Sequence, residues 1–335
     1  MRQTGQEENT VVGKIHKAAE KAENIIRPFI RETPLEHSPY LSLITSSEVY
    51  LKLENMQITG SFKLRGAMNK ILSLTPSQLK KGLITASSGN HGAAFAYLVD
   101  RFRIKGTIYL PESAPKTKID ALRHHNAEIK LGGNDCILAE IAARSAAEST
   151  GRKYISPYND LAIIGGQATI GVELQRQSGK TNAVFIPIGG GGLAAGIGGY
   201  LKAFDKNIAI IGCQPESSPV MYESVKAGHI VEMESKPTIS DGTAGGIEKN
   251  AITLDICREV IDDFVLVSEK EIRDAIKLIL ERHYLLIEGA AALSVAAFLK
   301  TKNKYSGKCV VLIISGAKIS LGKLQDILCD QEGTS

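Results

Sequence analysis

The chain of 335 residues has little cysteine, and none of it forms a recognisable structural site. The five cysteines give an odd count, and no C-x-x-C pair occurs. This pattern disfavours both a disulfide framework and a cysteine zinc site. Cys213 and Cys309 fall inside apolar runs, where a thiol usually serves as a small core residue. A reducing, cytoplasmic setting fits this cysteine usage.

Long runs of one residue type are also missing. No apolar run approaches the roughly 20 residues that a membrane-spanning helix needs. The chain begins with polar and charged residues, which predicts that no secretory signal peptide is present. The formal charge is only +4, and the basic residues are scattered along the chain. Neither a membrane nor a nucleic acid is therefore expected as a partner.

Short β-type runs alternate with helical patterns along the chain. Its length exceeds the roughly 250–300 residues at which single cores stop growing, which predicts two lobes. Periodicity predicts helices at 10–27, 119–124, 137–147 and 272–280. Apolar runs predict strands at 48–54, 82–86, 106–110, 127–131, 183–188, 208–213, 264–267 and 309–314. This alternation predicts an α/β fold of open, twisted parallel sheets with helices on both faces.

A lysine at the expected start of a helix is the first chemical candidate. Lys63 lies between Phe62 and Leu64, just after a turn at Gly60. On its own it could be an ordinary surface lysine. Three further segments, each following a predicted strand, change that interpretation.

Four adjacent glycines follow the predicted strand at 183–188 and precede a helix start; they occupy positions 189–192. Consecutive glycines let backbone N–H groups converge on an anion, and a helix N-terminus adds its positive dipole end. The segment also satisfies a loose G-x-G-x-x-A dinucleotide pattern, and it could be a mere tight turn. A dinucleotide site needs an acid at the end of the next strand, and none stands there. A single phosphate suits the segment better.

A polar turn follows the predicted strand at 82–86. It reads Ser87-Ser88-Gly89-Asn90-His91-Gly92. Free N–H groups with hydroxyl and amide side chains can hold a carboxylate there. Alternatively, Ser88 or Asn90 simply caps the following helix.

Ser315 closes the predicted buried strand at 309–314. Ligands of open α/β sheets bind at the carboxyl ends of parallel strands, so this hydroxyl can face a pyridine nitrogen. A serine capping its own turn is the alternative. Unlike a carboxylate, a hydroxyl does not force the nitrogen to stay protonated. A pyridine ring whose nitrogen is not protonated withdraws electrons less strongly than a protonated one. This weaker withdrawal favours eliminations and proton transfers over transamination.

Together the four segments supply an amine for an aldehyde, a polar turn, a phosphate cradle and a ring-nitrogen partner. These are the parts that hold pyridoxal phosphate. In this order and spacing the segments resemble the fold-type II pyridoxal-phosphate enzymes, in particular threonine/serine dehydratases and serine racemases. The likeness extends from Ile26 to Leu328, with S-F-K-x-R-G-A at 61–67 and G-G-G-G-L at 189–193 as its most specific motifs.

The resemblance implies a role for each matching position. Lys63 would carry the cofactor and later act as acid and base at the substrate α-carbon, with Phe62 packed beside the ring. Asn90 would meet the ring 3-hydroxyl and Ser315 the ring nitrogen, with Glu288 near the ring. The phosphate would be held by Gly189, Gly190, Gly191, Gly192 and Leu193, and the substrate carboxylate by Ser87, Ser88, Asn90 and His91.

The resemblance also implies a tryptophan-synthase-β-like division into two domains. Residues 1–65 and 156–335 would form a large cofactor-binding domain, and residues 66–155 a small domain. No C-terminal regulatory domain is expected. The expected partners are a small amino-acid substrate and further copies of the chain, in a homodimer or homotetramer.

Several positions depart from the family pattern. Ser88 stands where many dehydratases have alanine and where serine racemases have the serine that acts opposite the lysine. The cation ligands of racemases match Gln214, Ser218 and Val220, which are poor ligands for a hard cation, so no metal is expected. Lys318 replaces the usual asparagine after Ser-Gly-Ala. The segment at 241–246 is richer in glycine than expected for a racemase.

The leading hypothesis is a lyase that converts L-threonine or L-serine to a 2-oxo acid and ammonia. A serine racemase and a hydroxyaspartate ammonia-lyase are the alternatives within the same chemistry. A non-catalytic nucleotide-binding or sensor protein of the same fold is the alternative from a different class.

Overall fold

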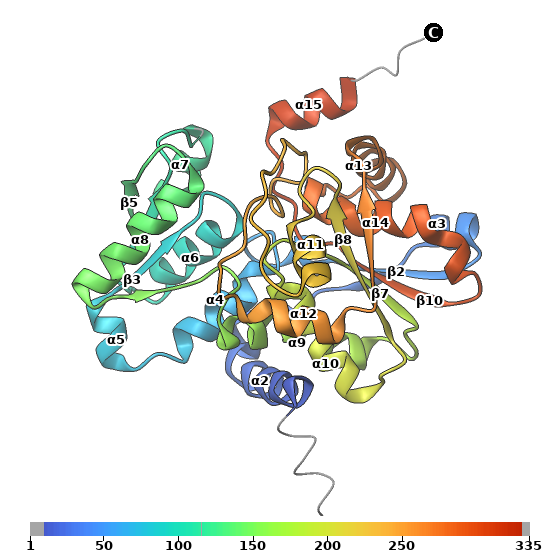
Figure 1. The fold of residues 1–335 in the computed structure, drawn as a ribbon, viewed down its shortest axis with the longest axis horizontal. Helices are drawn as coiled ribbons and strands as arrows, with labels where there is room; N and C mark the ends of the chain where they lie inside the picture. The colour runs from blue at the N-terminus through green and yellow to red at the C-terminus, as the bar shows by residue number, and fades with distance from the viewer. Residues whose placement is uncertain (1–9, 115, 330–335) are drawn as a thin grey trace, which may run out of the picture.

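Two separate sheets organise the protein, whose computed structural model describes residues 10–114 and 116–329. Figure 1 shows the smaller sheet and its helices on one side of the molecule and the larger sheet on the other. The six-stranded sheet has the order β1 (Leu35–His37), β2 (Glu48–Lys52), β10 (Cys309–Ile313), β7 (Ala183–Pro187), β8 (Ala209–Pro215) and β9 (Asp263–Val267). The four-stranded sheet has the order β5 (Glu128–Leu131), β4 (Gly106–Leu110), β3 (Leu83–Ala86) and β6 (Lys153–Tyr154).

Helices connect most of these strands and cover the sheets. The α-helices up to β6 are α2 (Val11–Ile26), α3 (Pro39–Thr45), α4 (Lys63–Leu72), α5 (Pro76–Lys81), α6 (Asn90–Arg101), α7 (Lys116–Arg123) and α8 (Cys136–Thr150). Those after it are α9 (Leu161–Gln177), α10 (Gly192–Phe204), α11 (Val220–Ala227), α12 (Ile252–Val260), α13 (Glu269–His283), α14 (Gly289–Thr301) and α15 (Leu321–Cys329). Several begin at side-chain caps: Thr10 accepts from the Gly13 amide, and Ser268 forms a capping box with Glu271.

The central strands β7 and β10 are buried along their whole length. Successive residues of β10 belong to opposite cores, with Leu312 in the core that includes α13 and α14 and Val311 in the core that includes α9 and α10. A strand covered on both faces has no polar side to present. This explains why these strands are continuous apolar runs.

The predicted α/β class is confirmed, with nearly all strand pairs parallel. β1 pairs antiparallel with β2, so the larger sheet is mixed. β6 was not predicted, because two residues give no readable period. The proposed boundaries of the two domains stay a prediction. Among the described residues, none of the helices combines the length and the apolar character needed to span a bilayer.

Candidate active site

One cavity of about 980 Å³ brings together the residues that the sequence predicted for cofactor and substrate. It lies where polar turns leave β3, β7 and β10 at their carboxyl ends, which are the usual ligand-binding ends of parallel strands. Residues predicted for cofactor and substrate that line it are Phe62, Lys63, Ser87, Ser88, Asn90, His91, Gly189, Gly190, Gly191, Gly192, Leu193, Glu288 and Ser315.

Lys63 is the first residue of α4, and its ammonium donates to the Pro157 carbonyl oxygen at 2.9 Å. It lies 5.1 Å from the centre of the Phe62 ring. Burial lowers the pKa of Lys63 to about 8, although Glu288 opposes this shift. Roughly a tenth of Lys63 is therefore an uncharged amine at pH 7, which is the form that a nucleophile requires.

Backbone contacts fix the segment that carries Lys63. Ser61 forms an isolated β-bridge with Gly316, and the Phe62 amide donates to the Ser315 carbonyl at 3.2 Å. Behind it, α4 crosses α9 with glycine against glycine: a Cβ added to Gly166 would lie 2.6 Å from the Gly66 Cα. These contacts hold the backbone segment that carries Lys63 beside the segment that carries Ser315.

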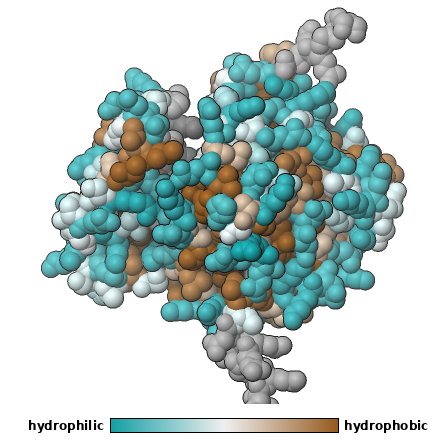
Figure 2. Space-filling model, in the orientation of Figure 1, coloured by the Kyte–Doolittle hydropathy of each residue, from teal (hydrophilic) through white to brown (hydrophobic). Residues whose placement is uncertain are grey.

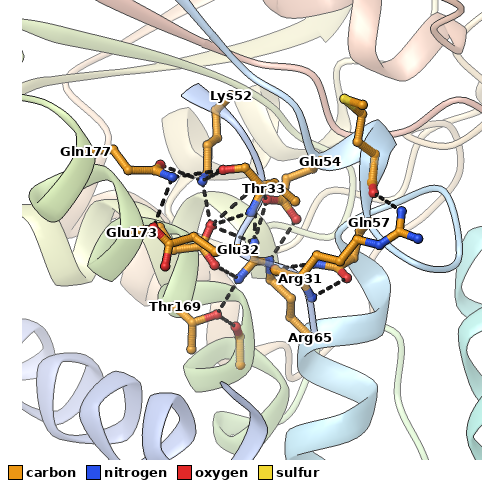
Figure 3. Close-up of polar contacts among 12 residues, drawn as sticks. Arg31, Glu32, Thr33, Lys52, Glu54, Gln57, Arg65, Thr169, Glu173 and Gln177 are labelled. Atoms are coloured by element: carbon orange, nitrogen blue, oxygen red, sulfur yellow. Dashed lines mark hydrogen bonds and ion pairs between the residues drawn. The ribbon is translucent and has the colours of Figure 1, made fainter. Parts of the chain in front are cut away.

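A buried cluster of charges anchors α4 from the other side (Figure 3). The guanidinium of Arg65 donates to Glu54 at 2.8 Å and to both carboxylate oxygens of Glu173, at 2.6 and 2.9 Å. Lys52 donates to Glu173 at 2.5 Å, and Thr33 donates to Glu54 at 2.6 Å. The side chains of Lys52, Arg65, Glu54 and Glu173 are fully buried. Residues far apart in sequence therefore hold the lysine-bearing helix against α9 and β2.

The turn after β3 does not contain the side-chain cap that was the alternative interpretation of Ser88 and Asn90. Gly89 occupies the N-cap of α6 with no side-chain hydrogen bond, and the Ser87 hydroxyl accepts from the Gly89 amide at 3.2 Å. Asn90 donates instead to both oxygens of Glu288, at 2.9 and 2.8 Å. Neither Ser88 nor Asn90 caps the helix, which leaves the N-terminal amides of α6 available to an anion.

Two titratable side chains beside the turn have displaced pKa values. Burial raises the pKa of Glu288 to about 7, against the hydrogen bond from Asn90. Burial lowers the pKa of His91 to about 3, and one ring nitrogen contacts the Ile155 carbonyl at 3.1 Å. His91 is therefore neutral at physiological pH and is held by backbone. Glu288 is poised to hold or release a proton near neutrality.

The glycine segment has the backbone shape of an anion cradle. Gly191, with φ of +84°, precedes the first residue of α10. A Cβ on Gly190 would lie 2.5 Å from the ring of Tyr158, and one on Gly189 would lie 3.0 Å from the Thr243 Cα. Any larger residue at Gly189 or Gly190 would therefore crowd Thr243 or Tyr158, which explains why glycine stands at both positions.

Tyr158 and Thr59 line this cavity and were missed by sequence reasoning. The Tyr158 hydroxyl accepts from the Glu248 amide at 2.8 Å, so its ring is fixed over the glycines. Tyr158 follows the two-residue strand β6, which gave no sequence signal. Thr59 stands four residues before Lys63, directly before the turn at Gly60.

Three buried oxygen atoms around the cavity lack hydrogen-bond partners among the described residues. They are the Ser315 hydroxyl, the Asn90 amide oxygen and the Thr59 hydroxyl. Buried polar groups are nearly always paired, so these atoms indicate a polar ligand between them. With a free amine and a glycine cradle in the same cavity, these residues fit pyridoxal phosphate.

The positions matched to racemase cation ligands are used differently. The Gln214 side chain accepts from the Tyr222 amide at 2.7 Å, and the Ser218 and Ser235 hydroxyls lie 2.7 Å apart. Val220 is buried in the core at the start of α11. In residues 10–114 and 116–329, no three His, Cys, Asp or Glu side chains cluster as metal ligands would. The expectation of a metal-free site stays a prediction.

Comparison with known proteins agrees with this geometry. A catabolic L-threonine dehydratase of Staphylococcus aureus is 40% identical over 313 residues, covering 92% of this chain and 90% of that protein. The processed threonine deaminase isoform 2 of Solanum lycopersicum superposes with a TM-score of 0.89 at 34% identity, covering 94% of this chain and 87% of that one. Maize serine racemase gives 0.88 at 29% identity, covering 94% and 96%.

The family described as "Pyridoxal-phosphate dependent enzyme" matches residues 26–316, a span that includes every site residue named above. Its cofactor is the one that the free amine, the glycine cradle and the unpartnered oxygens fit. This protein belongs to the family of pyridoxal-phosphate-dependent enzymes.

Proposed function

We propose that this protein is an ammonia-lyase that converts L-threonine or L-serine to a 2-oxo acid and ammonia. The observation that carries the proposal is that a partly buried amine, Lys63, lies on backbone adjoining Ser315, whose buried hydroxyl has no hydrogen-bond partner among the described residues. A hydroxyl at the ring nitrogen suits elimination better than transamination. The similarity to threonine dehydratases and deaminases supports the same reaction.

When bound, pyridoxal phosphate withdraws electrons from the substrate α-carbon and makes its C–H bond acidic. Lys63 takes this proton in our proposal, because the lowered pKa leaves its amine partly unprotonated. The β-hydroxyl then leaves as water, and hydrolysis of the resulting enamine releases ammonia.

The turn at 87–90 orients the substrate in this proposal. Its uncapped amides at the start of α6 face the cavity and bind the α-carboxylate without a cationic side chain. His91 supports the turn as a neutral ring bound to the Ile155 carbonyl. Tyr158 and Thr243 shape the cradle in which the glycines hold the cofactor phosphate.

Product analysis tests the proposal. The cofactor-loaded protein is incubated with L-threonine and, separately, with L-serine. We expect equal amounts of 2-oxobutanoate and ammonia from L-threonine. Formation of D-serine without any 2-oxo acid would establish the racemase alternative. Cofactor binding with no turnover of either amino acid would favour the sensor alternative.

Ser315→Ala should lower the rate of threonine dehydration by about 10-fold, because one hydrogen bond to the ring is lost. Ser315→Asp should shift the visible absorption of the bound cofactor, since a carboxylate favours a protonated ring nitrogen. Absorption spectra and initial rates of both variants check this. Wild-type spectra and rates in both would place Ser315 away from the ring.

Serine racemisation is a second candidate, favoured by Ser88. Its side chain lines the cavity and makes no hydrogen bond to other described residues. A racemase needs two acid/base groups, one on each face of the planar carbanion. Lys63 serves one face, and Ser88 is the hydroxyl that the family places on the other.

Ser88→Ala should remove any D-serine formation while sparing a substantial part of L-threonine dehydration. Dehydration needs an acid/base group only on the side of the carbanion that faces Lys63, together with a proton for the leaving hydroxyl. Chiral chromatography of wild-type and variant reactions with L-serine measures both outcomes. If the variant produces D-serine at the wild-type rate, Ser88 has no acid/base role and only contacts the substrate carboxylate.

We further propose that the protein works in the cytoplasm as a homodimer or homotetramer. The compartment has indirect support, because Cys213, Cys257, Cys309 and Cys329 are free thiols, as a reducing compartment would leave them; the assembly rests on the family resemblance. Light scattering after size-exclusion chromatography gives the assembly, and a monomer at micromolar concentration would contradict it.

A further inference from the structure

The segment at 156–159 adjoins two separate parts of the cofactor site. The Pro157 carbonyl oxygen accepts from the Lys63 ammonium at 2.9 Å. The ring of Tyr158 packs on the glycine segment, where a Cβ on Gly190 would lie 2.5 Å from it. One short stretch of backbone thus contacts both the amine expected to carry the cofactor and the glycines expected to hold its phosphate.

This stretch lies between regular elements. It follows β6, which is two residues long, and it ends just before α9. Within it, the Ser156 hydroxyl accepts from the amides of Tyr158 and Asn159 at 3.4 and 3.0 Å. These local contacts shape the turn, and contacts with a distant part of the chain fix where it lies.

Glu248 supplies those distant contacts, from the loop between α11 and α12. Its amide donates to the Tyr158 hydroxyl at 2.8 Å. Its carboxylate accepts from the Asn159 side chain at 2.8 Å and from the Ser156 hydroxyl at 3.5 Å. At the start of α12, the Ile252 amide donates to the side-chain oxygen of Asn159 at 2.9 Å. Three side chains of the stretch are thus bound by one glutamate.

The Glu248 carboxylate is itself placed by an ion pair with Arg144, at 2.7 Å, and both side chains are partly buried. Arg144 belongs to α8, which packs on β3 and β4 of the smaller sheet. Ile247, next to Glu248, belongs to the core that includes α9 and α10. Figure 2 shows hydrophilic residues interspersed with hydrophobic ones on the face that carries this loop, so contacts between the lobes there can be polar. The ion pair links the two lobes beside the glycine segment.

We propose that Glu248 is a positioning residue for pyridoxal phosphate: by binding residues 156–159, it places the Pro157 carbonyl at Lys63 and the Tyr158 ring on the glycine segment. Neither Glu248 nor Asn159 is among the described residues that line the cavity, so Glu248 acts through the stretch that it binds. The inference concerns cofactor binding, and it holds whichever amino acid the protein dehydrates.

Cofactor affinity provides the test. Equilibrium dialysis of the holoenzyme against a series of pyridoxal phosphate concentrations, followed by the visible absorption of the bound cofactor, gives its dissociation constant. We expect Glu248→Ala to raise this constant about 10-fold, the effect of losing one hydrogen bond to a charged group. Asn159→Ala, which removes a side chain that Glu248 binds, should raise it by a similar factor. The matched control is Glu232→Ala, which should keep the wild-type constant, because Glu232 is an exposed carboxylate of the same loop, paired with Lys249 at 2.8 Å.

The double variant separates positioning from a general loss of structure. If Glu248 acts through Asn159, Glu248→Ala should add little to Asn159→Ala, so the double variant should bind the cofactor about as tightly as either single variant. Circular dichroism checks that each variant is folded. Tyr158→Phe keeps the ring but loses the hydroxyl that Glu248 binds, and it should also weaken cofactor binding. It provides an independent test if an alanine variant fails to fold.

The outcomes distinguish this inference from the proposed function. Additive losses in the double variant would mean that Glu248 acts elsewhere in its loop, and they would overturn the positioning proposal. A wild-type dissociation constant in folded Glu248→Ala would overturn it as well. A wild-type holoenzyme that binds the cofactor but forms no 2-oxo acid from L-threonine or L-serine would instead overturn the proposed function alone.

Discussion

Replacing Lys63 with alanine is expected to lower the rate of threonine dehydration by about 10³-fold or more, since attachment point and proton acceptor are lost together. The fold should survive, because the Lys63 side chain makes a single hydrogen bond, to Pro157. Initial rates of 2-oxobutanoate formation give the activity. Borohydride treatment followed by peptide mass analysis gives the attachment site.

Lys80 provides the control for this substitution. It is an exposed lysine of α5, seventeen residues along the chain and outside the cavity. Lys80→Ala should retain the wild-type rate and the wild-type covalent adduct. Full turnover by Lys63→Ala, or an adduct on a different lysine, would refute the assignment of Lys63.

The second large effect concerns stability. Glu173→Gln keeps the shape of the side chain but leaves Lys52 and Arg65 without their shared counter-charge in a fully buried cluster. Breaking a buried ion pair by removing one partner costs about 3–5 kcal/mol, because an uncompensated charge stays buried. The midpoint of urea unfolding should fall accordingly. Glu32→Gln, at the exposed rim of the same region, should cost less than about 1 kcal/mol.

The same carboxylate makes a testable contribution to pH dependence. Contacts with Arg65 and Lys52 lower the pKa of Glu173 to about 2, from an ordinary value of 4.5, despite its burial. A depressed pKa in the folded state stabilises the protein above the unfolded value, and this contribution is lost as the pH falls from about 4.5 to about 2. The stability difference between the wild type and Glu173→Gln should therefore shrink across that interval. A constant difference would mean that packing, not charge, accounts for the loss.

Sequence patterns predicted the parts of this site that are contiguous. The apolar runs before Gly189 and Ser315 become β7 and β10, and each delivers its polar turn to the cavity. The helix predicted at 10–27 forms within one residue at each end because Thr10 caps it. Such signals depend on neighbours in the chain, so they can be read from one sequence.

Contacts between residues that are distant in sequence could not be predicted from such local patterns. Lys52, Arg65 and Glu173 carry no pattern that brings them together, and each alone is typical of a surface charge. Tyr158 packs on the glycine segment across more than thirty residues of sequence. The lowered pKa of Lys63 likewise depends on the walls of a cavity assembled from both sheets.

The pairing of β2 with β10 has a consequence for how the chain acquires its structure. These strands are neighbours in the larger sheet, yet Leu51 pairs with Leu312, which lies far along the chain from it. Contacts between residues so far apart in sequence form late and slow folding. During synthesis, the edge of β2 stays open until β10 has emerged, so nascent chains present an unpaired strand that chaperones can bind. Because Ser315 lies just beyond β10, the backbone contact between Phe62 and Ser315 can form only after β10 has been made.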